Sequence, residues 1–93
     1  MEKYSEVLRG YTFVRDPAAL RVGAYVRWIR DGHLTNGAFL VDVKPKDSGF
    51  ELFVKNNGRF FSVPAEDVFV FQKLTADELL FLKFKKFAAY KGK

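Results

Sequence analysis

Residues 50–63 read Phe-Glu-Leu-Phe-Val-Lys-Asn-Asn-Gly-Arg-Phe-Phe-Ser-Val, and this stretch decides the fold. The Asn-Asn-Gly sequence at 56–58 is the strongest hairpin signal in the chain, because Asn and Gly tolerate the positive φ angles of tight turns. Phe50, Leu52 and Val54 share one face at a period of two residues, and a second strand-like run follows the turn at 59–63. The stretch therefore predicts an antiparallel β-hairpin.

Outward from this hairpin, the chain carries further short segments with the β-branched and aromatic content of strands. They are Gly10–Val14, Ala24–Arg30, Ala38–Lys44 and Val68–Gln72. Together with the hairpin they predict a mainly β domain, a small antiparallel SH3-like or Tudor-like barrel of five or six strands. An OB-fold is the nearest alternative. That fold usually has a helix between its third and fourth strands, and this sequence has no helical pattern at that place. The expected core residues are Phe39, Val41, Val43, Leu52, Val54, Val68 and Val70.

One helix is predicted after the last strand. Thr75 is placed as its N-cap, and Glu78 three residues later completes a capping box. The helix then runs from Ala76 to about Tyr90, with Gly92 as a possible end. Its most apolar stripe is expected to dock on the barrel through Leu80, Phe84 and Phe87. Residues 1–93 thus form one domain, with the barrel over about 10–73 and the C-terminal helix over about 75–90.

The composition excludes several classes of function. The 93 residues include eleven Phe, one His and no Cys, which excludes disulfides and thiolate metal sites and disfavours a His-based zinc site. No apolar run is long enough for a transmembrane helix, and the first residues contain no apolar h-region, so no secretory signal is expected. His33, between two Gly-bearing turns, is interpreted as a loop residue without a catalytic partner. We therefore expect a non-enzymatic protein that is not secreted and uses no cofactor or metal.

The formal net charge is +5, and most of the excess lies at the C-terminal end. Such asymmetry indicates an anionic partner, although a solvated helix face is the simpler interpretation. Arginines also alternate with Tyr25 and Trp28, a combination that could bind nucleic acid through phosphate contacts and stacking. Trp28 itself is expected in the core. The candidate nucleic-acid contacts are Arg21, Arg27, Arg30, Lys85, Lys86 and Lys91.

Five segments of the chain carry a resemblance. They are Leu20–Ile29 (LRVGAYVRWI), Gly37–Val41 (GAFLV), Val54–Asn56 (VKN), Phe61–Val63 (FSV) and Val68–Lys73 (VFVFQK). Their order and spacing resemble small uncharacterised proteins of nucleocytoplasmic large DNA viruses. The sequence departs from that pattern at Ala38, where the pattern has Gly, and at Phe61, where it has Trp. The resemblance covers about residues 20–73. It implies a virion-associated barrel that is a minor capsid protein or another virion component, located in the virion or the host cytoplasm. If the protein is not viral, we expect it to be intracellular.

The predicted helix has apolar residues outside its docking stripe, which suggests a second role. Leu79 and Leu82 fall among lysines, and such a surface is typical of an interface with an apolar centre and a charged rim. The candidate partner interface is Leu79, Leu82, Lys83, Lys86 and Tyr90. The alternative is that Val7 and Leu8 fold back over these leucines. The sequence thus favours a structural or assembly protein that binds other protein subunits, with a nucleic-acid-binding module as the alternative.

Overall fold

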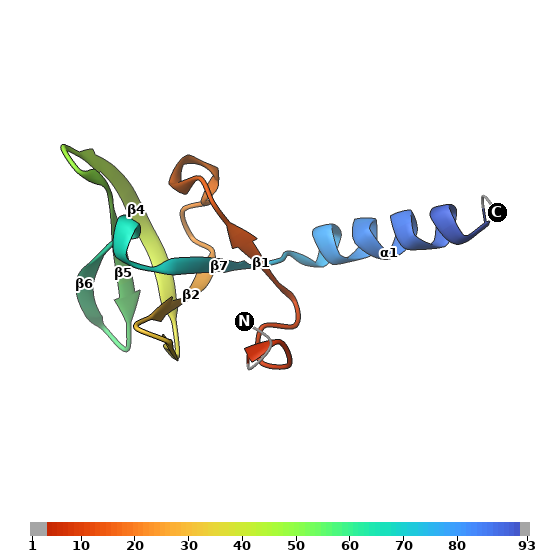
Figure 1. The fold of residues 1–93 in the computed structure, drawn as a ribbon, viewed down its shortest axis with the longest axis horizontal. Coiled ribbons are helices and arrows are strands. Elements are labelled where there is room, and N and C mark those ends of the chain that lie inside the picture. Colours follow the sequence, from red (N-terminus) through yellow and green to blue (C-terminus); the bar gives the residue numbers. More distant parts are fainter. Residues whose placement is uncertain (1–3, 92–93) are drawn as a thin grey trace.

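The computed structural model describes residues 4–91, with side chains as far as Lys85, and contains a curved antiparallel sheet from which one helix projects (Figure 1). The strands are β1 (Tyr11–Val14), β2 (Tyr25–Arg30), β3 (His33–Leu34), β4 (Ala38–Lys46), β5 (Gly49–Asn56), β6 (Arg59–Pro64) and β7 (Phe69–Lys73). Two short 3₁₀ helices, η2 (Pro17–Ala19) and η3 (Ala65–Asp67), lie between strands, and helix α1 (Ala76–Lys91) follows β7. The mainly β prediction with one C-terminal helix is confirmed. The described residues form seven strands rather than five or six, because the two-residue strand β3 pairs with β2.

The sheet is open, with the strand order β1-β7-β2-β4-β5-β6. Strand β7 pairs with both β1 and β2, so each of its edges is occupied. Strand β6 pairs with β5, and no ladder joins it to β1 across the described residues. The described sheet is therefore not a closed barrel, since closure requires the two edge strands to pair, and the SH3-like or Tudor-like form stays a prediction.

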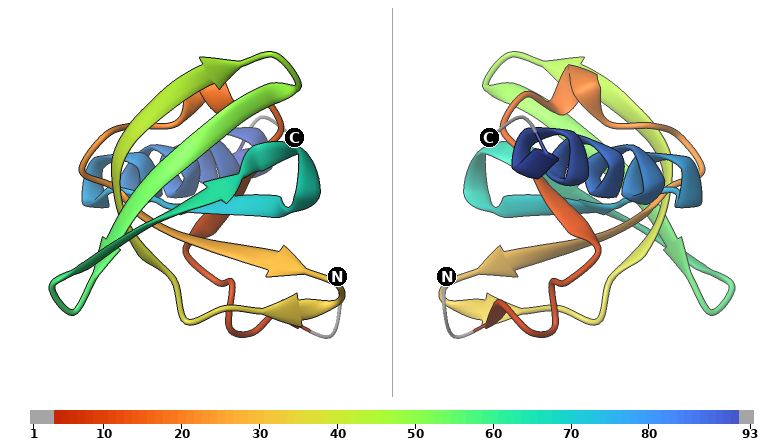
Figure 2. Two further views of the ribbon diagram at one scale, coloured as in Figure 1. Left: turned by 90° about the vertical axis from the view of Figure 1, so that its left-hand side faces the viewer. Right: turned by 90° about the vertical axis from the view of Figure 1, so that its right-hand side faces the viewer.

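The hairpin that decides the fold has the predicted turn. Asn57 and Gly58 have φ angles of 53° and 77°, which are the left-handed values of a two-residue type I′ turn. The turn places Asn56 opposite Arg59 and aligns the whole of β6 with residues 51–56 of β5. The twist of this hairpin and its neighbours curves the strands around a common interior, as the two end-on views show (Figure 2).

A β-bulge in β4 shifts the alternation of inside and outside, so that only the residues up to the bulge are reversed from the prediction. Leu40 lies opposite Val54, but Asp42 lies opposite Phe53, so Val41 is an extra residue without a partner. As a result Leu40 is 1% exposed, whereas Phe39 is 55% and Val41 40% exposed. The predictions of Phe39 and Val41 as core residues are wrong, because period-two alternation does not continue through a bulge.

The main core fills the concave side of the sheet. Its buried members are Val26, Trp28, Ala38, Leu40, Leu52, Val54, Val63 and Val70. The predicted burial of Leu52, Val54, Val70 and Trp28 is confirmed, and Val43 and Val68 are partly buried against this cluster. A second, smaller cluster on the opposite side joins Leu8, Ile29 and Phe71. The N-terminal segment therefore covers β2 and β7.

Candidate interaction site

Helix α1 begins at the predicted capping box. The backbone N–H of Thr75 donates to Glu78 Oε1 at 2.7 Å, and the backbone N–H of Glu78 donates to Thr75 Oγ1 at 3.1 Å. The bond from the Thr75 backbone lowers the pKa of Glu78, and the nearby Arg21 guanidinium lowers it further. Two backbone donors that the helix cannot satisfy itself are therefore paired, and the start of α1 is fixed at this point.

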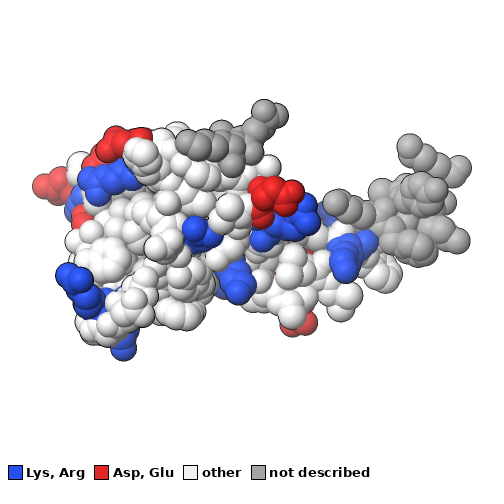
Figure 3. Space-filling view, turned by 90° about the horizontal axis from the view of Figure 1, so that it is seen from below, with Lys and Arg blue, Asp and Glu red and all other residues white. Residues whose placement is uncertain are grey.

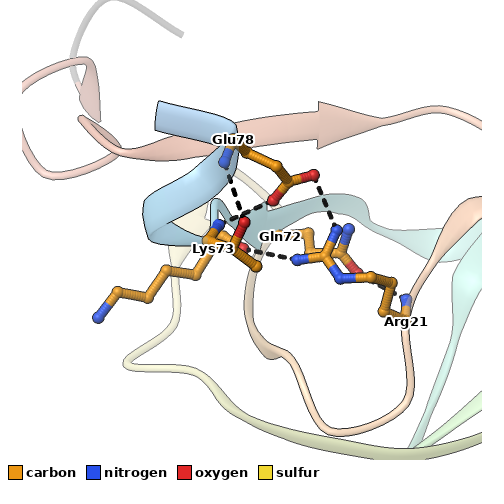
Figure 4. A network of polar contacts seen from close by, with 5 residues as sticks. Arg21, Gln72, Lys73 and Glu78 are labelled. Atoms are coloured by element: carbon orange, nitrogen blue, oxygen red, sulfur yellow. Dashed lines mark hydrogen bonds and ion pairs between the residues drawn. The ribbon is translucent and has the colours of Figure 1, made fainter. Parts of the chain in front are cut away.

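Arg21 fastens the first turn of α1 to the sheet (Figure 4). Its Nη1 donates to Glu78 Oε2 at 3.1 Å, and its Nη2 donates to the Lys73 carbonyl at 3.2 Å. The backbone N–H of Arg21 donates to Oε1 of the buried Gln72 at 2.7 Å. An exposed ion pair contributes little stability. These bonds instead set the direction in which the helix leaves β7.

Beyond its first turn, α1 extends away from the sheet (Figure 1). Leu80 is 66%, Phe81 61% and Phe84 67% exposed. The prediction that Leu80 and Phe84 dock on the barrel is therefore wrong, and the side chain of Phe87 lies outside the described residues. The physical reason is twofold: Trp28 and its neighbours already fill the concave side of the sheet, and the Arg21 bonds direct the helix axis outward.

The helix side predicted to bind a partner is also accessible. Leu79 is 42% and Leu82 46% exposed, and Lys83 is exposed. Lys86 and Tyr90 have side chains outside the described part. The alternative in which the N-terminal segment covers the two leucines is wrong, because Leu8 packs with Ile29 and Phe71 instead. Helix α1 therefore exposes apolar side chains both on the stripe predicted to dock on the barrel and on the side predicted to bind a partner.

The predicted nucleic-acid contacts are not gathered on one face. Arg21 is held at the start of α1, Arg27 Nε donates to the Thr35 carbonyl at 2.9 Å, and Arg30 lies 3.8 Å from Asp67. Lys85 lies on the helix, and the side chains of Lys86 and Lys91 fall outside the described residues. Lys and Arg form small separate groups on a largely uncharged surface (Figure 3). On the face that Figure 3 shows, the described residues form no single basic patch.

A row of side chains on the convex side of the sheet was missed by the sequence analysis. Tyr25, Phe39, Lys55 and Phe60 are direct partners on β2, β4, β5 and β6. The Tyr25 and Phe39 rings meet edge to face with centroids 4.9 Å apart, and Lys55 Nζ lies 5.2 Å from the Phe60 centroid. The two-residue turn at 57–58 already fixes Lys55 opposite Phe60, so this half of the row could have been predicted.

The described residues show no cluster of side chains suited to metal binding. No three His, Asp or Glu side chains within that part could hold a metal ion together. Among the same residues, no helix is long and apolar enough to span a membrane. Comparison with protein-family models, curated proteins and solved structures finds no match to the chain.

Proposed function

We propose that this chain is a non-enzymatic assembly protein whose helix α1 joins it to other copies of itself. The observation that carries the proposal is the exposure of Leu80, Phe81 and Phe84, each above 60%, on a helix that stands away from the sheet. A helix with apolar residues around most of its circumference is normally buried. Leu80, Phe81 and Phe84 stay mostly uncovered within the described part of the chain, so in this proposal other chains supply their cover.

The charges along α1 favour an antiparallel partner helix of the same sequence. Asp77 and Glu78 lie in the first turn, whereas the lysines begin at Lys83. Two copies side by side in the same direction would align like charges, but an antiparallel pair sets the acidic first turn of one against the basic end of the other. The lysines can extend their charged ends to the rim of such an interface.

The apolar stripe suits the same arrangement. Leu80 and Phe87 are placed almost symmetrically about Phe84 in the sequence. A two-fold axis at Phe84 would therefore set Phe84 against its own copy and Leu80 against Phe87, which is the self-complementary pattern of an isologous contact. Leu79 and Leu82 lie outside this stripe and would remain available for further copies or for other subunits.

Two further predictions from the sequence, the virion setting and the SH3-like or Tudor-like form of the sheet, belong to the same proposal. An assembly role agrees with the virion setting that the resemblance implies, with a minor capsid protein as its concrete form. The SH3-like or Tudor-like character of the sheet, which the strand pattern predicts, is part of the same proposal. Neither is needed for the helix to act as the assembly element.

Molar mass measured by light scattering tests the proposal. We expect the wild-type chain to exceed one chain mass, with the mass rising as protein concentration rises. The Leu80→Ser/Phe84→Ser variant should have the mass of one chain, and Leu79→Ser/Leu82→Ser should lose only larger species. Val22→Ser is the matched control, because Val22 is 65% exposed but lies off the helix.

The contradicting result is a wild-type chain that remains a monomer over the whole accessible concentration range. A Val22→Ser variant that dissociates as fully as the helix variant would also contradict the proposal, since the contact would then lie on the sheet.

A further inference from the structure

The convex side of the sheet carries two exposed aromatic rings with a lysine between them. Phe39 is 55% and Phe60 66% exposed, and Lys55 lies between them on β5. Tyr25 on β2 is the direct partner of Phe39 on β4. Tyr25, Phe39, Lys55 and Phe60 together are called the cross-strand row. Neighbouring strands are about 4.8 Å apart, so the row is about 14 Å long. The edge-to-face contact with Tyr25 limits the freedom of the Phe39 ring.

Each end of the cross-strand row opens into a surface hollow. The hollow beside Phe39 has a volume of about 680 Å³, and Arg21 and Lys73 contribute to its lining. The hollow beside Phe60 has a volume of about 340 Å³, and Asn57 and Arg59 contribute to its lining. No carboxylate lines either hollow among the described residues.

Acidic residues on the convex side lie farther along the strands and are already paired. Asp42 accepts a hydrogen bond from the Val43 backbone N–H at 2.8 Å and lies 4.0 Å from Lys44. Glu51 lies 2.8 Å from Lys46 Nζ. The free charge along the cross-strand row and at its ends is therefore positive, from Lys55, Arg59 and Lys73.

We propose that the cross-strand row binds single-stranded nucleic acid. Bases would stack on the exposed faces of Phe39 and Phe60, and phosphates would contact Lys55, Arg59 and Lys73. The alternation of ring, cation and ring matches the alternation of base and phosphate along a strand. A duplex keeps its bases stacked on one another and cannot place them on these rings. Because every base has a π face, this binding has little sequence preference. This inference does not depend on helix-mediated assembly.

The test measures affinity for a fluorescein-labelled oligothymidylate of about 12 nucleotides by fluorescence anisotropy with the full-length chain. Phe39→Leu and Phe60→Leu should each weaken binding by about five- to 150-fold, the range found when one stacking ring is removed. Phe13→Leu is the matched control, because Phe13 is 44% exposed on edge strand β1 and lies outside the cross-strand row. The Phe13→Leu variant should bind with an affinity within about twofold of the wild-type value, since no base stacks on Phe13.

Salt dependence supplies a second readout that does not rely on the rings. Replacing Lys55 with Gln should reduce the slope of log K against log salt by about 0.7, the value for one phosphate contact on a single strand. A Lys83→Gln/Lys85→Gln variant should retain most of the affinity, because those lysines lie on α1. Thermal unfolding of each variant confirms that the sheet is intact.

Several outcomes would overturn the inference. They are no binding at low salt, equal affinity for a fluorescein-labelled duplex of the same length, or Phe39→Leu and Phe60→Leu variants that both bind as the wild type does. Loss of binding in Lys83→Gln/Lys85→Gln alone would assign the contact to the helix instead. Equal competition by a polyglutamate peptide would assign the cross-strand row to an acidic protein segment.

Discussion

Truncating Phe84 to Ala distinguishes a free helix from a docked one. A fully buried Phe costs about 3–5 kcal/mol when it is replaced by Ala. Phe84 is 67% exposed, so about a third of a side-chain surface of ~200 Å² is covered. That area corresponds to about 1.7 kcal/mol at 25 cal/mol per Å², and the better helix propensity of Ala offsets roughly 0.5 kcal/mol of it. We therefore expect the single chain to lose no more than about 1.2 kcal/mol.

Urea unfolding followed by Trp28 fluorescence provides the assay, because Trp28 is the only tryptophan and lies in the core of the sheet. It should be run at the lowest usable protein concentration, where association contributes least. Leu52→Ala is the comparison, since Leu52 is fully buried and should lose about 2–5 kcal/mol. If Phe84→Ala also loses 3 kcal/mol or more, the helix docks on the sheet and the reasoning fails.

Three further predictions concern the scaffold. Gly37→Ala should destabilise the chain by about 2–4 kcal/mol in urea unfolding, because Gly37 has a φ of +93° and an added Cβ would lie 2.5 Å from the Val26 carbonyl oxygen. Bonds to Lys46 lower the pKa values of Glu51 and Glu66 below their ordinary 4.5, so their stabilising contribution is present above that pH and disappears as pH falls. Glu66→Gln should flatten this acid dependence in pH-resolved melting curves, and an unchanged curve would contradict it. Thr75→Ala should cost α1 about 0.5–2 kcal/mol, seen as lower helical circular dichroism without a change in the Trp28 signal.

Local signals in the sequence predicted the turns and the helix start well. The type I′ turn at Asn57-Gly58 and the capping box at Thr75 and Glu78 each depend on residues close together in the chain, so their chemistry can be read directly. The buried members Leu52 and Val54 follow from the alternation next to that turn. These features need no knowledge of distant contacts.

Features that depend on distant partners could not be predicted in the same way. The bulge that exposes Phe39 and Val41 comes from the pairing of β4 with β5, and no residue type in β4 marks it. The exposure of Leu80 and Phe84 depends on the direction that Arg21 gives to α1 from 57 positions away. A helical stripe shows that a face needs a partner, but it does not say whether the partner is in the same chain.

The most direct test of helix-mediated assembly uses the absence of cysteine from the chain. A Phe84→Cys variant has a single thiol at the proposed two-fold axis, where two copies lie close enough for a disulfide. We predict that mild oxidation converts it to a cross-linked dimer on a non-reducing gel, whereas Val22→Cys, equally accessible but off the helix, stays a single chain. If both variants cross-link at the same slow rate, or neither does, the helices do not meet at Phe84 and the assembly proposal is contradicted.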